Sequence, residues 1–150
     1  MSQVFKKKQA AGDDRPSADD LREQRLEDVR TVAERFIFDL GRLIAGHETD
    51  FHEYVVPSLA ATLVSSVEPF LETGDAMRPN FGDYGEMRVE GNLLDPRVPI
   101  SAQIEFTDQS VRESAGGDLI PTPRRRMVLT MTIDPQEGMI TAVSLVAKDS

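Results

Sequence analysis

The chain has 150 residues, of which 39% are hydrophobic and 29% are charged, and its formal net charge is −9. This composition fits one domain of a soluble globular protein. The acidic balance argues against nucleic acid as the main partner, because a nucleic-acid backbone is recognised by a clustered positive face. The chain has no cysteine, which excludes disulfides, thiolate zinc sites and cysteine nucleophiles.

Residues 1–16 are expected to form a disordered N-terminal arm ahead of a single domain over residues 17–150. The arm is small and polar, and Lys6, Lys7 and Lys8 give it one short basic cluster. We expect this cluster to be solvated, with an anionic surface as the alternative contact, since few charges bind weakly at physiological salt. No apolar stretch reaches the roughly 20 residues that span a bilayer, so we expect a cytoplasmic protein without a membrane span.

A long helix is predicted from Ser17 to Gly46. Ser17 is a good N-cap, acids follow it in the first turn, and apolar residues then recur at three- and four-residue steps. A second helical region is predicted to start with a capping box at Asp50 and to begin a fresh helix at Pro57, because proline is favoured at the first helical position. Pro69 is expected to kink or end this helix.

The C-terminal half is predicted to form strands, because apolar and polar residues alternate in it. The predicted strands cover residues 86–94, 98–111, 125–133 and 139–147. Residues 75–85 before them are predicted to be a connecting loop, with a lid over a cavity as the alternative. Short connections imply antiparallel neighbours. The predicted fold class is therefore α+β, with N-terminal helices packed against a curved, cone-like antiparallel sheet of four or more strands.

Three strand segments carry a family resemblance: Ile104-Glu-Phe-Thr-Asp-Gln-Ser, Pro121-Thr-Pro-Arg-Arg-Arg and Val128-Leu-Thr-Met-Thr-Ile-Asp. They are most similar to accessory proteins of mammalian-cell-entry transporters and to related domains of conjugation machinery. More broadly, residues 17–147 resemble the nuclear-transport-factor-two-like superfamily, which also holds ketosteroid isomerases, scytalone dehydratases and polyketide cyclases. The resemblance implies a pocket between helices and sheet, frequent homodimers through the sheet face, and many members without activity.

A proton-transfer site of the isomerase type would need a carboxylate base inside the cone and a donor for an oxyanion. Asp39 is the carboxylate to inspect, and Tyr54 and Tyr84 are the only phenols. A buried Asp39 would be a candidate for a perturbed pKa. Helical periodicity instead predicts that Asp39 faces solvent, opposite Phe36 and Leu40. Asp39, Tyr54 and Tyr84 are therefore weak catalytic candidates, and none of them matches the isomerase motif.

His47 and His52 lie near the predicted start of the second helical region, beside Glu48, Asp50 and Glu53. Metal ligands on one helix face are spaced by three or four residues, whereas these histidines are five apart. We therefore predict surface histidines and no metal site. The sequence also lacks a glycine-rich phosphate loop, a serine elbow and a nucleotide fingerprint, so no cofactor is expected.

The densest positive cluster is Arg124, Arg125 and Arg126. Alternation points Arg124 and Arg126 to the face opposite Met127. The cluster is a candidate contact for an acidic partner, a carboxylate or a phosphate. The alternative is a solvated edge that balances acids on neighbouring strands. Met127 and Met131 are expected in the core or in an adaptable subunit contact.

These patterns favour a non-enzymatic accessory domain that self-associates or docks into a larger assembly through its sheet, with a homodimer as one form. The three arginines and the acids near Asp108 and Glu113 would set the register electrostatically. The alternatives are an isomerase, dehydratase or cyclase and a carrier of a small apolar ligand. An enzyme needs a buried acid with a polar partner at the cavity, a carrier needs a cavity with apolar walls, and an interaction domain needs neither.

Overall fold

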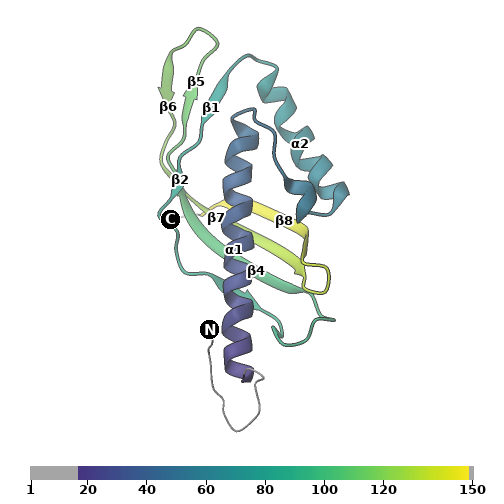
Figure 1. Ribbon diagram of the computed structural model, residues 1–150. Helices are drawn as coiled ribbons and strands as arrows, with labels where there is room; N and C mark the ends of the chain where they lie inside the picture. Colours follow the sequence, from purple (N-terminus) through teal and green to yellow (C-terminus); the bar gives the residue numbers. More distant parts are fainter. Residues whose placement is uncertain (1–16, 149–150) are drawn as a thin grey trace, which may run out of the picture.

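The computed structural model describes residues 17–148 and confirms the α+β class, with helices packed on antiparallel strands (Figure 1). Among these residues, no helix combines the length and hydropathy required to cross a bilayer. The elements, in chain order, are α1 (Ala18–Ile44), the 3-10 turn η1 (Phe51–Glu53), α2 (Pro57–Leu71), β1 (Ala76–Arg78), β2 (Phe81–Gly82), β3 (Arg88–Glu90), β4 (Ile100–Asp108), β5 (Val111–Glu113), β6 (Leu119–Pro121), β7 (Arg125–Asp134) and β8 (Met139–Ala147).

The strands form two antiparallel sheets. The larger sheet has five strands in the order β2–β4–β7–β8, and β3 also pairs with β4. The smaller sheet has three strands in the order β1–β5–β6 and lies beside the C-terminal half of α1 (Figure 1). The three long strands β4, β7 and β8 therefore form the platform on which α1 lies.

Helix α1 starts where the sequence predicts. The Ser17 hydroxyl accepts a 3.1 Å hydrogen bond from the backbone N–H of Asp20, which satisfies one of the free donors at the helix start. Its apolar stripe then faces the sheet and is buried. The buried stripe consists of Val29, Ala33, Phe36, Ile37, Leu40 and Leu43.

The predicted alternation holds in β4 and β7, and it divides the sheet into two faces. Ile104 on β4 pairs with Leu129 on β7, and both are buried under α1. This inner face also buries Ile100, Ala102, Phe106, Met127, Met131 and Ile133. The side chains between these residues point to the opposite, outer face, which no helix of the described residues covers and which the segment at residues 83–85 contacts at one end. The core therefore lies on one side of the sheet only.

Three strand boundaries differ from the predictions. The strand predicted over residues 86–94 is only β3, and the strand predicted over 98–111 stops at Asp108. The Asp108 carboxylate accepts a 2.9 Å hydrogen bond from the N–H of Ser110, which turns the chain out of the large sheet. The predicted loop over residues 75–85 contains β1 and β2, because partner strands pair with these short segments.

The second helical region also differs in part. Asp50 makes no capping hydrogen bond with its side chain, so the predicted capping box does not form, and η1 takes its place. Helix α2 begins at Pro57 as predicted, but it continues past Pro69 to Leu71 because Pro69 lies in its last turn. No residue of α2 is fully buried, so this helix lies at the margin of the core.

Candidate functional site

Asp39 is buried, at 6% exposed, and the prediction that it faces solvent is wrong. Its carboxylate accepts a 2.6 Å hydrogen bond from the hydroxyl of Tyr54, which is also buried. Arg35, one turn earlier on α1, lies 3.8 Å from the Asp39 carboxylate and 4.4 Å from the centre of the Tyr54 ring. The turn that carries Tyr54 covers this side of α1, so two of the three catalytic candidates are neighbours.

The charged and polar groups around Asp39 and Tyr54 form hydrogen bonds with one another. Burial, and then the hydrogen bond to Asp39, raise the pKa of Tyr54 well above its ordinary value. A hydrogen bond from Arg35 lowers the pKa of Glu53 below its usual range, and the same bond raises the pKa of Arg35. Tyr54 is thus a neutral hydrogen-bond donor, and Arg35 joins α1 to the turn through Glu53.

Neither residue of the Asp39–Tyr54 pair lines the three hollows of about 360, 350 and 660 Å³ that lie along the described residues. Tyr84 lines a separate hollow of about 350 Å³ with Phe38 and Phe81, and no carboxylate lines it. The residues of an isomerase-type site are therefore not brought together at one cavity.

A second hollow lies between the N-terminal half of α1 and the end of the large sheet. Its volume is about 360 Å³, and Arg25 and Asp28 are its charged lining residues. Apolar walls of this kind are what the predicted carrier of a small ligand needs, and that function stays a prediction. The apolar part of the lining is Val29, Val32, Leu93, Pro96, Ile100, Ile133 and Pro135.

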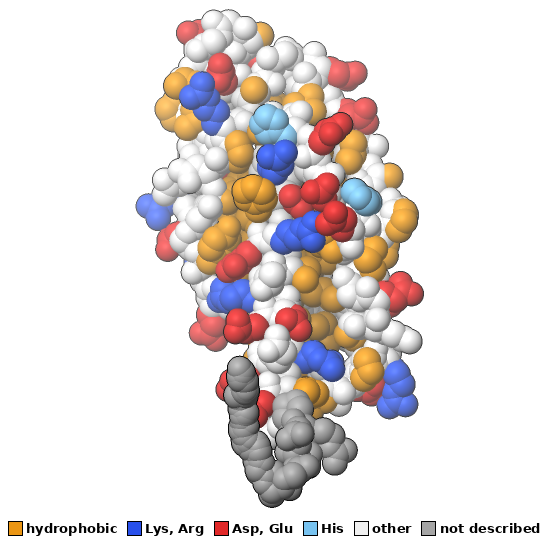
Figure 2. All heavy atoms as spheres, in the orientation of Figure 1, with side chains coloured by type: hydrophobic (Ala, Val, Ile, Leu, Met, Phe, Trp, Pro, Cys, Tyr) orange, Lys and Arg blue, Asp and Glu red, His pale blue; other side chains and the backbone are white. Residues whose placement is uncertain are grey.

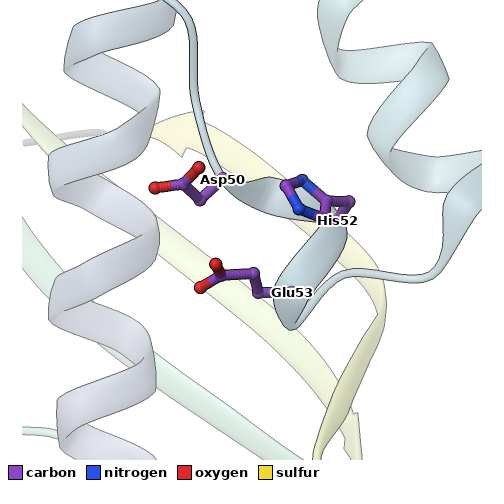
Figure 3. Close-up of side chains that lie close together, drawn as sticks. All are labelled: Asp50, His52 and Glu53. Atoms are coloured by element: carbon purple, nitrogen blue, oxygen red, sulfur yellow. The ribbon is translucent and has the colours of Figure 1, made fainter.

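Asp50, His52 and Glu53 form a cluster on the η1 turn (Figure 3). One potential ligand atom of each residue lies within 4.8 Å of the others. All three residues are exposed, and Glu53 already binds the guanidinium of Arg35. Because a bound cation would compete with that guanidinium, we assign no metal to this cluster.

The arginine cluster is paired with acids of its own chain. Arg126 lies on the outer face, where it donates to the Thr107 hydroxyl at 2.8 Å and to the Glu105 carboxylate at 3.3 Å. Arg125 lies 3.3 Å from Asp108, and Arg124 lies 3.7 Å from the carboxylate of Asp83. Glu113 is likewise engaged, by Arg78 at 2.9 Å. The three arginines are therefore paired within the chain, and both readings of the cluster, a contact for a partner and a solvated edge, stay predictions.

The pairing of Glu105 gives a pH prediction. Hydrogen bonds from Lys148 and then Arg126 lower the pKa of Glu105. A depressed pKa in the folded state adds stability that is present above the unfolded pKa of about 4.3 and is lost as pH falls through the lower folded value. We expect Glu105→Gln to lose less stability than wild type between about pH 5 and pH 3, measured by urea unfolding.

Glu137→Gln is the matched control for this prediction, because Glu137 is exposed in a turn and forms no ion pair within residues 17–148. We expect this variant to keep the acid dependence of wild type. Identical acid dependence in all three proteins would contradict the role of the Lys148–Glu105–Arg126 pairing.

Two of the five predicted interaction residues are internal. Met127 and Met131 lie in the core against α1, so they do not form an exposed contact. The exposed apolar side chains of the large sheet lie instead on β8, at Leu145 and Val146. The sequence analysis recognised β8 as a strand but missed these two residues. The lack of any charged residue from Met139 to Ala147 was the sequence signal that could have identified them as exposed apolar residues.

Charged side chains are mixed on the side of the molecule that carries the helices. Figure 2 shows Lys and Arg side chains scattered among acids over the described part of this side, rather than gathered into one basic area. No family model and no curated protein matches the chain.

Proposed function

We propose that this protein is a non-enzymatic accessory domain that associates with a second copy of itself through its β-sheet. The proposal rests on one observation: the helices cover only one face of the large sheet (Figure 1). Helix α1 lies on the inner face, whereas no helix of residues 17–148 covers the outer face, which only the segment at residues 83–85 contacts, beside Arg126 and Glu105. A sheet with an uncovered face and a free edge offers groups for pairing with another chain.

The exposed apolar area of the sheet favours a second copy as the partner. Leu145 and Val146 are 40% and 54% exposed and point to opposite faces of β8. Val146 lies beside Val128 of β7 on the outer face, and Leu145 lies beside Leu129 on the inner face. An uncharged patch can meet its own copy without placing like charges opposite each other.

Two further points support a non-enzymatic role. Asp39, the one fully buried acid of the described residues, is held by Tyr54 away from the hollows. Membership of the nuclear-transport-factor-two-like superfamily, which we keep as part of the proposal, implies frequent homodimers through the sheet. The order of two helices followed by antiparallel strands agrees with that membership.

The proposal predicts that Val146→Glu converts a dimer to a monomer. The substitution places a carboxylate on the patch of each copy, and the two chains each carry a net charge of −9. Sedimentation equilibrium over a micromolar concentration series measures the change from the mass of two copies to the mass of one.

Val64→Glu on α2 is the matched control, because Val64 is 44% exposed and lies outside the sheet. This variant should keep the dimer mass. A wild-type chain that stays monomeric across the series would overturn the proposal, and so would equal loss of the dimer in both variants.

A further inference from the structure

A hollow of about 350 Å³ opens on the flank of α1. It lies between the C-terminal half of this helix and the segment at residues 79–84, which contains β2, on the other side of α1 from α2 (Figure 1). Its volume falls within the range of roughly 300–1,000 Å³ that small-molecule sites occupy. Strands β2 and β8 lie at opposite ends of the strand order, so this hollow is separate from the exposed side chains of β8.

Three aromatic rings line this hollow: Phe38 from α1, and Phe81 and Tyr84 from the facing segment. Phe81 and Tyr84 both lie beside the ring of the buried Phe106, at centroid distances of 5.3 and 6.4 Å, so the core holds this wall in place. Phe38 is 65% exposed and Tyr84 is 40% exposed. A single exposed ring is ordinary on a protein surface, but three rings around one hollow offer faces on which a planar ring can stack.

A glycine in α1 allows the facing segment to come close to the helix. A Cβ atom on Gly41 would lie 3.3 Å from the Cβ of Pro79 and 3.4 Å from the ring of Phe81. The segment is also tied to the turn after β4, because the backbone N–H of Asn80 donates to the Ser110 hydroxyl at 3.2 Å. The two walls are therefore held at a fixed separation, and the hollow is formed without a ligand, as most small-molecule sites are.

The polar lining of the hollow consists of Arg42, His47, Asn80 and the Tyr84 hydroxyl, and it contains no carboxylate. The Arg42 guanidinium donates to the carbonyl of Glu48 at 3.3 Å and forms no ion pair within residues 17–148. A guanidinium has five N–H donors, arranged in a fork that matches a carboxylate. In a chain with a net charge of −9, a hollow that has a guanidinium and no acid favours a ligand with a negative group.

The charges near the hollow favour one negative charge over two. Burial, and then the charge of Glu34, raise the pKa of Tyr84, so Glu34 acts on this hollow although Arg30 pairs with it at 3.4 Å. Further acids line the neighbouring hollow on the α2 side. The carbonyl end of α1, where the helix dipole is negative, also lies here. A phosphate dianion would meet this repulsion twice over, whereas one carboxylate is matched by Arg42 alone.

From these observations we propose that this hollow binds a small planar aromatic carboxylate. Its ring would lie among Phe38, Phe81 and Tyr84, and its carboxylate would accept hydrogen bonds from Arg42, with the amide of Asn80 as a second polar contact. This inference goes beyond the proposed function and does not depend on it. Self-association is assigned to the β-sheet, whereas this ligand is assigned to the flank of α1.

Naphthalene-2-carboxylate is a suitable probe, because it joins a planar ring to one carboxylate and is fluorescent. The chain has no tryptophan, so the fluorescence of the probe can be followed directly. We expect saturable binding of one probe per chain, and weaker binding of naphthalene-2-carboxamide, which has the same ring and no charge. Arg42→Gln is expected to weaken binding of the carboxylate about five- to tenfold and to leave binding of the carboxamide unchanged.

Arg88→Gln is the matched control, because Arg88 is also exposed, forms no ion pair within residues 17–148 and lines none of the three large hollows. This variant should keep the wild-type affinity. Phe38→Ala tests the aromatic wall, and the exposure of Phe38 means that its removal leaves the core intact. We expect this variant to weaken binding of both probes about three- to tenfold.

Amide chemical shifts in NMR spectra locate the bound probe. Shift changes confined to Gly41, Asn80 and Phe81 would support the site. Shift changes at Val29 and Ile133, which line the hollow of about 360 Å³ at the other end of α1, would overturn it.

Three other results would overturn the inference. They are the absence of saturable binding up to millimolar probe, equal affinity for the carboxylate and the carboxamide, and equal affinity of the Arg42→Gln and Arg88→Gln variants. The mass in sedimentation equilibrium tests the proposed function separately. Failure of this inference and failure of the proposed function are therefore distinguishable.

Discussion

Replacing Asp39 by alanine is expected to lower the free energy of unfolding by about 2–4 kcal/mol, because a buried hydrogen-bonded carboxylate is removed and its donor loses its partner. The donor is the Tyr54 hydroxyl at 2.6 Å, and Arg35 loses its contact at 3.8 Å. Asp39→Asn keeps an acceptor oxygen in the same place, so we expect a smaller loss. Urea unfolding of the three proteins measures both differences.

The same pair predicts an alkaline dependence of stability. Burial and the bond to Asp39 raise the pKa of Tyr54, so the folded state keeps the phenol proton above pH 10, where the unfolded state releases it. This contribution is fully present below the unfolded pKa and is lost as pH rises toward the folded value. Each released proton lowers the free energy of unfolding by about 1.4 kcal/mol per pH unit in that range.

Tyr54→Phe should therefore show a shallower alkaline slope than wild type above about pH 10. Tyr84 is retained in both proteins, so the smaller upward shift of its pKa by burial cancels in the comparison. Equal slopes would contradict the assignment of the alkaline dependence to Tyr54.

The hydrogen bond between Asp39 and Tyr54 also gives the buried Asp39 a structural role. Asp39 and Tyr54 come from α1 and from the residue that follows η1, and their hydrogen bond fixes the turn against the helix. Tyr54 and Val56 in turn bond to Ile140 at the start of β8. A structural role therefore accounts for the contacts of Asp39, and its removal is expected to disturb the bridged end of β8 as well as the helix.

Replacing Phe36 by alanine is expected to cost about 3–5 kcal/mol of unfolding free energy, the usual loss for a large aromatic residue in a packed core. Phe36 is 1% exposed, faces the sheet from α1 and lies 5.5 Å from the ring centre of Phe51. The substitution leaves a cavity that the neighbouring β-sheet cannot fill by collapse. Urea or thermal unfolding measures the loss.

Phe38→Ala is the control on the same helix, because Phe38 is 65% exposed. Exposed substitutions usually change stability by less than about 0.5 kcal/mol. Equal losses for Phe36 and Phe38 would contradict the packing of α1 on the sheet through its predicted apolar stripe. A large loss for Phe36 alone would support it.

Local residue patterns were sufficient to predict the long elements of this protein. Helix α1 depends on the Ser17 cap and on apolar residues at three- and four-residue steps, and these signals act within a few turns. The strands β4, β7 and β8 depend on alternation, which directs successive side chains to opposite faces wherever the strand is placed. The short strands β1, β2 and β3 were missed or misplaced because pairing partners decide them, and those partners lie far along the chain.

The candidate sites depended on tertiary contacts. Helical periodicity placed Asp39 toward solvent, and only the docking of the Tyr54 turn on α1 buries it, since burial depends on what packs over a helix face. Alternation placed Arg126 on the outer face, but its pairing with Glu105 required the register of β4 against β7. The sequence determined that β8 is an uncharged apolar strand. Only the sheet order decided that this strand has an open edge, because edge position is a property of the assembled sheet and of no single strand.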